Sequence, residues 1–265
     1  MGGGADIIGL IEMATMRARF SIRSFSKALI KQMEASGVAV LRQLAGLEPG
    51  SVLAREEHAV YALESRINRA FFHGFENDSF DESGVTRILD PAARRAARLS
   101  EFRGMKLTDP AHCVDPSHPD FHAPFRRFCR RKTKQLWSQF SWQILFRSPH
   151  ERHAFTSSFL EASKCVWLLH RLAFSVHPSL TILRVAKGLD IDPLYVDAVP
   201  DLMTKTKKKP RHCPGNEMSA PPPLSLCPTC SRAKVEFLIM PGFQAFDNKL
   251  LVKCQVYQHI RCSLD

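Results

Sequence analysis

Two cysteines in the last quarter of the chain have a spacing that suits zinc. Cys227 and Cys230 are separated by two residues, so both thiolates can reach one tetrahedral ion. His212 and Cys213 lie upstream, but adjacent side chains of an extended chain point in opposite directions. Because this half-motif lies in a proline-rich segment, we expect free thiols in a flexible loop and predict no metal or other cofactor.

A second group of possible metal ligands lies in residues 109–124, which hold four prolines and three histidines. Its members are His112, Cys113, His118 and His122. The proline content favours a surface loop with solvated histidines over a metal site. His170 lies within an apolar helical segment, between Leu169 and Arg171, and we expect it to be a hydrogen-bonded residue of the core or its edge rather than a catalytic one.

Residues 125–137 (FRRFCRRKTKQLW) carry the strongest electrostatic signal of the chain. In a helix, five basic side chains would share one side, namely Arg126, Arg127, Arg130, Arg131 and Lys134. Apolar side chains would face the core, namely Phe125, Phe128, Cys129, Leu136 and Phe140. This basic amphipathic helix predicts binding to an anionic membrane surface, an acidic protein or a phosphorylated segment, with a merely solvated face as the alternative. We do not predict nucleic-acid binding, since the aromatic side chains face inward.

Another basic run, at residues 205–211, resembles a nuclear localisation signal or a charged linker. Its basic residues are Lys205, Lys207, Lys208, Lys209 and Arg211. Elsewhere, the glycines form neither GxGxxG nor GxxxxGK[ST], and GxSxG, HExxH and recognisable carboxylate-pair motifs are absent. The sequence therefore predicts no enzyme.

The overall composition is that of a globular protein with a basic surface. Of the 265 residues, 37 are Lys or Arg and 26 are Asp or Glu, a formal charge of +11 that favours anionic partners. No apolar run is long enough to cross a membrane, and the N-terminus lacks a secretory signal pattern. We expect a cytoplasmic protein with reduced thiols, and membrane association or a nuclear location as alternatives.

Helical periodicity dominates the first two thirds of the chain. It predicts helices over residues 22–33, 52–75, 92–104, 125–146 and 154–178. The last of these has one apolar face at Phe155, Phe159, Ala162, Val166, Leu169 and Ala173. Its opposite face carries Trp167, Leu168 and Phe174. A helix that is apolar nearly all round predicts the buried centre of the core, ending before Pro178.

The last third changes to the two-residue period of strands. Short β-branched or alternating runs occupy residues 181–185, 234–240 and 252–256, with turn residues Pro241 and Gly242 between the last two. They predict an antiparallel hairpin with a long loop. The fold class is therefore α+β, a mainly helical domain with a small C-terminal antiparallel sheet.

The sequence predicts an N-terminal segment (1–19), a helical region (20–108) and a Pro/His-rich loop (109–124). A C-terminal domain follows (125–200 and 232–258), and a disordered basic and proline-rich insertion (201–231) interrupts it.

Four blocks, in this order, resemble a plant protein family that is named for gravitropism in the light and for interaction with a receptor-like kinase. They are residues 24–30 (SFSKALI) with 33–37 (MEASG), 59–65 (AVYALES) with 72–76 (FHGFE), 164–175 (KCVWLLHRLAFS), and 235–243 (VEFLIMPGF) with 252–257 (VKCQVY). The resemblance implies a non-enzymatic signalling adaptor of plants, cytoplasmic or membrane-associated, in light or gravity responses or with a receptor-like kinase as partner.

The chain also departs from the family pattern. It begins just before the first block, so we expect it to lack the coiled-coil-prone region that usually precedes that block. Ala28 stands where the family has a proline, and the basic run and the cysteine pair of residues 200–231 are not typical of the family. The family supplies no active-site residues to transfer to this chain.

Overall fold

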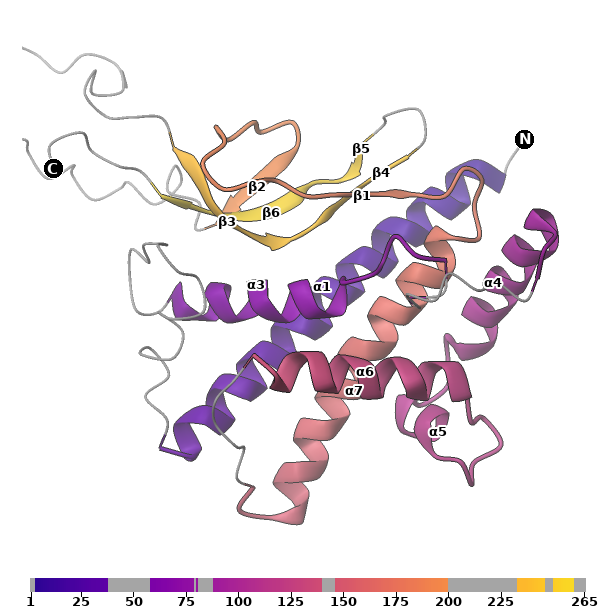
Figure 1. Ribbon diagram of the computed structural model, residues 1–265, viewed down its shortest axis with the longest axis horizontal. Coiled ribbons are helices and arrows are strands. Elements are labelled where there is room, and N and C mark those ends of the chain that lie inside the picture. Colours follow the sequence, from indigo (N-terminus) through magenta and orange to yellow (C-terminus); the bar gives the residue numbers. More distant parts are fainter. Residues whose placement is uncertain are drawn as a thin grey trace, which may run out of the picture.

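The computed structural model describes residues 3–37, 58–78, 80, 88–139, 146–199, 233–245 and 250–259. Within these ranges, six helices lie below two small three-stranded sheets (Figure 1). The predicted fold class, α+β with helices dominant, is confirmed.

Helix α1 (Gly3–Ala35) is far longer than the predicted helix over residues 22–33. Its buried face runs through the steps of three and four expected for a helix, at Ile11, Thr15, Ala18, Ile22, Phe25, Leu29 and Met33. Thr15 fits in this face because its hydroxyl donates to the carbonyl of Ile11, at 2.8 Å. The helix therefore runs without a break through residues 19 and 20, where the sequence suggested a boundary.

Helix α7 (Pro149–Ala173) is the predicted central helix. It begins where the Ser148 hydroxyl accepts from the amide of Glu151, with proline in the first turn, and it ends before Pro178 as expected. Trp167 is 1% exposed, which confirms its expected place in the core. The helix packs antiparallel to α1, because Phe25 in the second half of α1 meets Phe155 near the start of α7, while Leu10 near the start of α1 shares a pocket with Leu168 near the end of α7.

Helices α3 (Ala59–Phe71) and α4 (Pro91–Met105) lie within or close to their predicted ranges. A short helix, α5 (Pro110–Val114), corrects the prediction of a loop over residues 109–124. The Asp109 carboxylate accepts from the amide of Ala111 and Pro110 occupies the first turn, so the proline starts a helix here rather than preventing one.

Helix α6 (Ala123–Trp137) forms the predicted basic amphipathic helix. It begins where His122 Nδ1 accepts from the amide of Phe125, at 3.1 Å. The core-facing side chains expected from the sequence are buried at Phe125, Phe128, Cys129 and Leu136, while Phe140 lies outside the described residues. The prediction of the buried side of this helix is thus confirmed as far as it is described.

The strands form two sheets rather than one. The first has the order β1 (Thr181–Leu183), β4 (Gly242–Gln244), β5 (Leu250–Val252), and the second has the order β2 (Val196–Val199), β6 (Cys254–His259), β3 (Lys234–Met240). The predicted antiparallel pairing of β3 with β6 is confirmed. Strand β2, which the sequence did not predict, pairs with β6 in parallel, so the second sheet is mixed.

The turn predicted between β3 and β6 is wrong, because Gly242 and Phe243 lie in strand β4. A side chain at Gly242 would meet the carbonyl oxygen of Val252 at 2.5 Å, because β4 and β5 approach closely there. Pro241 therefore marks the point at which the chain leaves one sheet and enters the other.

One large core joins all six helices and reaches the sheets through Met240 and Phe243. A second, smaller cluster lies between α3 and the mixed sheet, where Ala62 packs with Phe237, Ile239 and Tyr257. The helices α1 and α7 form the most extensive helix pair of this core.

Candidate interaction site

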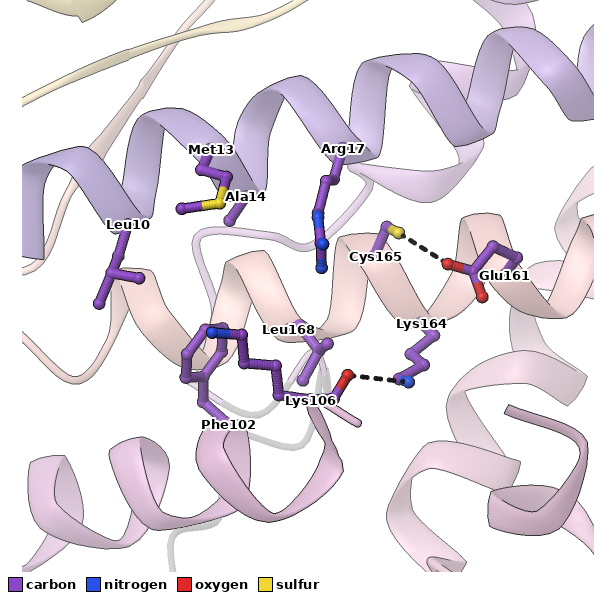
Figure 2. Close-up of a pocket in the computed structure, with 10 residues that line it drawn as sticks. All are labelled: Leu10, Met13, Ala14, Arg17, Phe102, Lys106, Glu161, Lys164, Cys165 and Leu168. Atoms are coloured by element: carbon purple, nitrogen blue, oxygen red, sulfur yellow. Dashed lines mark hydrogen bonds between the residues drawn. The ribbon is translucent and has the colours of Figure 1, made fainter. Parts of the chain in front are cut away.

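A small pocket opens where α1 crosses α7 beside the C-terminal end of α4 (Figure 2). It has a volume of about 50 Å³. Its apolar wall consists of Leu10, Met13 and Ala14 of α1, Phe102 of α4 and Leu168 of α7. Figure 2 shows Leu10 and Arg17 reaching from α1 toward α7. Such a pocket can take one apolar side chain.

Three cationic side chains and one carboxylate surround the pocket, namely Arg17, Lys106, Lys164 and Glu161. Lys164 is buried, and its ammonium donates to the backbone carbonyls of Lys106, at 3.3 Å, and of Thr108. It therefore holds the end of α4 against α7, where a cation also suits the helix C-terminus. The side chains of Arg17 and Lys106 form no ion pair with the described residues.

Cys165 also lines the pocket, but its thiol is not a nucleophile. Its Sγ lies 3.6 Å from Glu161 Oε1, to which it donates. Burial raises the pKa of Cys165 to about 11, since the thiolate would be poorly solvated there. The thiol therefore stays protonated near neutral pH and serves as part of the pocket wall.

Next to the pocket, α1 exposes apolar side chains on the side away from its buried face. Met13, Met16 and Phe20 are 48%, 59% and 75% exposed. Together with Leu10, they form what we call the α1 stripe, which is continuous with the pocket through Met13. The α1 stripe was not predicted from the sequence. The sequence does hold a signal for it, because residues 10–20 contain a second set of apolar side chains that do not belong to the buried face of α1.

The predicted basic face of α6 lies on the surface of the molecule. Arg127, Arg130 and Lys134 are exposed, while Arg126 and Arg131 are half-buried. Arg126 lies over the ring of Phe121, with 5.9 Å between the guanidinium carbon and the ring centre. The helix thus brings the five residues to one side, but only some of them reach far into solvent.

Lys132, in the same basic run, points the other way, and the sequence did not single it out. Its side chain is 1% exposed, and its Nζ donates to the carbonyls of Ala70 and His73, each at 2.8 Å. The ammonium also lies 5.2 Å from the ring centre of Phe80. Lys132 therefore links α6 to the end of α3 and does not contribute to an anion-binding face.

The structure brings together only part of the histidine group of residues 109–124. The rings of His112 and His118 stack with 3.8 Å between their centres, and Asp120 lies beside them. Cys113 is buried, and His122 caps α6 instead. Because His118 Nδ1 already accepts the amide hydrogen of Asp120, at 3.1 Å, its lone pair is not available to a metal ion.

His122 belongs to a partly buried polar cluster centred on Glu101 of α4. Glu101 Oε1 accepts from the indole of Trp167 at 3.0 Å and lies 3.2 Å from Arg171 Nε and 3.3 Å from His122 Nε2. Burial lowers the pKa of His122, although the Glu101 carboxylate acts in the opposite direction. The cluster fixes α4 to α7 through buried charges and leaves the carboxylate fully engaged.

His170 is fully buried, as expected for a core histidine. Its Nε2 lies 2.8 Å from the carbonyl of Asn77, and its ring lies between Phe80 and Phe174. Burial lowers the pKa of His170 well below the ordinary value, with the nearby Arg171 charge acting in the same direction. This side chain is neutral near pH 7 and structural in role.

A wider pocket of about 560 Å³ lies between α3 and strand β3. The charges on its wall are largely paired, since Arg184 bonds to Glu76 and Lys187 Nζ lies 2.9 Å from Glu236. The pocket beside the α1 stripe instead combines an apolar wall with two cations, Arg17 and Lys106, that form no ion pair within the described part of the chain.

The cysteine pair Cys227 and Cys230, with His212 and Cys213, and the basic run of residues 205–211 lie outside the described residues. Among the helices that the structure describes, none has the length and apolar character needed to cross a membrane.

Comparison with known proteins identifies two relatives, both from Arabidopsis thaliana. IRK-interacting protein is 27% identical over 243 residues, which cover 90% of this chain and 38% of that protein. Protein GRAVITROPIC IN THE LIGHT 1 is 27% identical over 217 residues, which cover 72% of this chain and 38% of that protein. This chain thus spans a little over a third of the curated relatives it matches. No family model matches the chain, and no solved structure does.

The names of these two relatives match the plant family that the four sequence blocks resemble. The predicted resemblance is therefore confirmed, and the chain is a relative of IRK-interacting protein and of Protein GRAVITROPIC IN THE LIGHT 1.

Proposed function

We propose that the chain is a non-enzymatic signalling protein that acts as an adaptor in plant growth responses to light or gravity and binds a receptor-like kinase. The observation that carries the proposal is the similarity, over 90% of this chain, to a protein named for its interaction with IRK. The second relative is named for gravitropism in the light. A cytoplasmic location, where the chain would meet the intracellular part of such a kinase, is part of the proposal.

The chemistry of the described surface supports binding rather than catalysis. The pocket thiol of Cys165 is protonated, and the Glu101 carboxylate is held by an indole and an arginine. By contrast, the α1 stripe offers apolar side chains that remain exposed in the isolated chain. Exposed apolar groups beside unpaired cations are typical of surfaces that bind another protein.

A binding experiment tests the proposal. The full chain is immobilised, and the purified cytoplasmic domain of a receptor-like kinase is titrated over it, with an unrelated soluble kinase as the specificity control. The proposal predicts saturable binding of the receptor-like kinase alone. Equal retention of both kinases, or retention no greater than on the bare surface, would refute it.

A second candidate function is supported by the basic face of α6. Arg127, Arg130 and Lys134 are exposed on one side of the helix, an arrangement that attracts anionic lipid headgroups or acidic proteins. Flotation with phosphatidylserine vesicles measures this. The triple change R127E, R130E and K134E should abolish flotation.

The matched control places the same three charge changes at exposed positions elsewhere, K27E, K31E and R103E. This control keeps the net charge of the variant equal to that of the α6 variant. If both variants lose flotation to the same extent, the effect is one of net charge and the α6 site is wrong.

A further inference from the structure

We propose that the pocket and the α1 stripe together bind an amphipathic helix that carries acidic side chains. The inference rests on the proposed function, because it assigns the surface and the chemical class of a protein partner. The pocket would take one apolar side chain of that helix, while Arg17 and Lys106 would face its acidic residues.

The apolar part of the surface is long enough to contact several turns of a partner helix. Leu10 and Phe20 are ten residues apart on α1, which is about 15 Å along the helix axis, or nearly three turns. Met13 lies between them and also lines the pocket. A partner helix with apolar residues at spacings of three, four and seven would cover this length with one face.

The pocket gives this surface a fixed anchor point. Phe102 and Leu168 form its wall on α4 and α7, and Lys164 fixes the end of α4 against α7 through the carbonyl of Lys106. One apolar anchor in a preformed pocket, surrounded by weaker contacts, is the usual distribution of energy in such interfaces. The two flexible methionines, Met13 and Met16, can adapt to the rest of the partner.

The charges around the pocket decide which kind of helix fits. Arg17 and Lys106 have no acidic partner among the described residues, and Glu161 is the single carboxylate in the pocket wall. The rim therefore carries an excess of positive charge, and acidic side chains on either side of the apolar face would complement it. A basic amphipathic helix, which would suit a membrane surface, would instead be repelled.

Selection from a random library of 16-residue peptides displayed on phage tests this inference. The full wild-type chain is the target, and the chain with F20S and R17E is the subtraction target. Selected peptides should carry apolar residues at spacings of three, four and seven, with more Asp and Glu than Lys and Arg. A synthetic peptide of the selected sequence should bind the double variant at least tenfold more weakly than the wild type.

The controls are L194S and K31E, which make the same kinds of change at exposed positions away from the pocket. They should leave the affinity within about twofold. The inference is wrong if the selected peptides are basic, if they lack helical spacing, or if they bind the F20S and R17E variant equally well. It is also wrong if F20S converts a dimer of the chain to a monomer, since the stripe would then bind a second copy.

Failure of this inference and failure of the proposed function give different results in the kinase experiment. If the kinase domain binds wild type and the F20S and R17E variant equally, the proposed function stands and this surface is not its site. If acidic helical peptides bind at the stripe but no receptor-like kinase does, the surface is assigned correctly and the identity of the proposed partner is wrong.

Discussion

Two lysines in the basic run of α6 differ in role, because one is buried and the other is exposed. Lys134 is exposed in solvent, whereas Lys132, two residues earlier, is buried and donates to two backbone carbonyls. The helical period predicts a basic side and an apolar side, and Lys132 lies on the apolar side. Net charge therefore overstates the number of cations that a partner can reach.

The change K132M should destabilise the protein while K134M should not. Methionine keeps most of the volume of Lys132 but leaves the carbonyls of Ala70 and His73 without their donor, at a cost of about 2 to 3 kcal/mol. At exposed Lys134 the same replacement should change stability by less than about 0.5 kcal/mol. Urea denaturation of both variants measures the difference, and equal stabilities would contradict the buried role of Lys132.

His170 should make the folded protein less stable in mild acid. Burial lowers its pKa well below 6.5, so the folded state stays neutral while the unfolded chain takes up a proton below that pH. Its contribution is therefore complete above the unfolded pKa and is lost as the pH falls, by up to about 1.4 kcal/mol per pH unit.

The change H170F removes this titration and keeps an aromatic ring between Phe80 and Phe174. Urea denaturation between pH 7.5 and 5 should show a smaller loss of stability for the variant than for the wild type. Parallel curves for the two proteins would mean that His170 is protonated in the folded state.

At the scale of elements, local patterns predicted the helices better than the strand pairing. Steps of three and four identified α7 and the second half of α1, but Thr15 and Ala18 are too small or too polar to stand out as core residues. The first half of α1 was therefore missed. Strand β2 was missed because its parallel partner β6 is more than fifty residues away, and no local signal reports such a pairing.

The candidate site was predicted less well than the fold. The basic face of α6 follows from spacing within one helix, so the sequence could place its five residues on one side. The pocket instead depends on how α1, α4 and α7 meet, which no pattern within one segment reveals. The histidine group shows the same limit, since His122 turned away to cap α6.

Trp167 should be the side chain on which α7 depends most. It packs against Phe128, with 5.3 Å between ring centres, and donates to Glu101. The change W167A should lower the free energy of unfolding by about 3 to 5 kcal/mol, and W167F should lower it less because much of the ring packing is kept. Full stability of W167A in urea denaturation, together with loss of partner binding, would identify the position as an interface instead.

Gly242 should tolerate no side chain, because strand β4 lies against the following strand. A Cβ there would be 2.5 Å from the carbonyl oxygen of Val252 and 2.8 Å from the amide nitrogen of Cys254. We expect G242A to cost about 1 to 3 kcal/mol in urea denaturation. The control, G104A in α4, meets nothing within 4 Å and should stabilise the protein by up to about 1 kcal/mol. A neutral G242A would show that the two strands can separate at little cost.

At the scale of the whole molecule, the two faces of α1 differ in what they contact. One face packs against α7 and α3, while Met16 and Phe20 remain exposed beside a pocket whose Arg17 and Lys106 pair with no acidic side chain in the described ranges. A helix that served the core alone would carry polar residues on its outer face. The proposed binding surface therefore lies on the most extensive helix pair of the described structure.

The most direct test of the central claim is a titration of the immobilised chain with the cytoplasmic domain of a receptor-like kinase, measured by biolayer interferometry. We expect saturable binding that an unrelated soluble kinase does not reproduce. A response that does not saturate, or that is the same for both kinases, would contradict the claim that this chain is a kinase-binding adaptor.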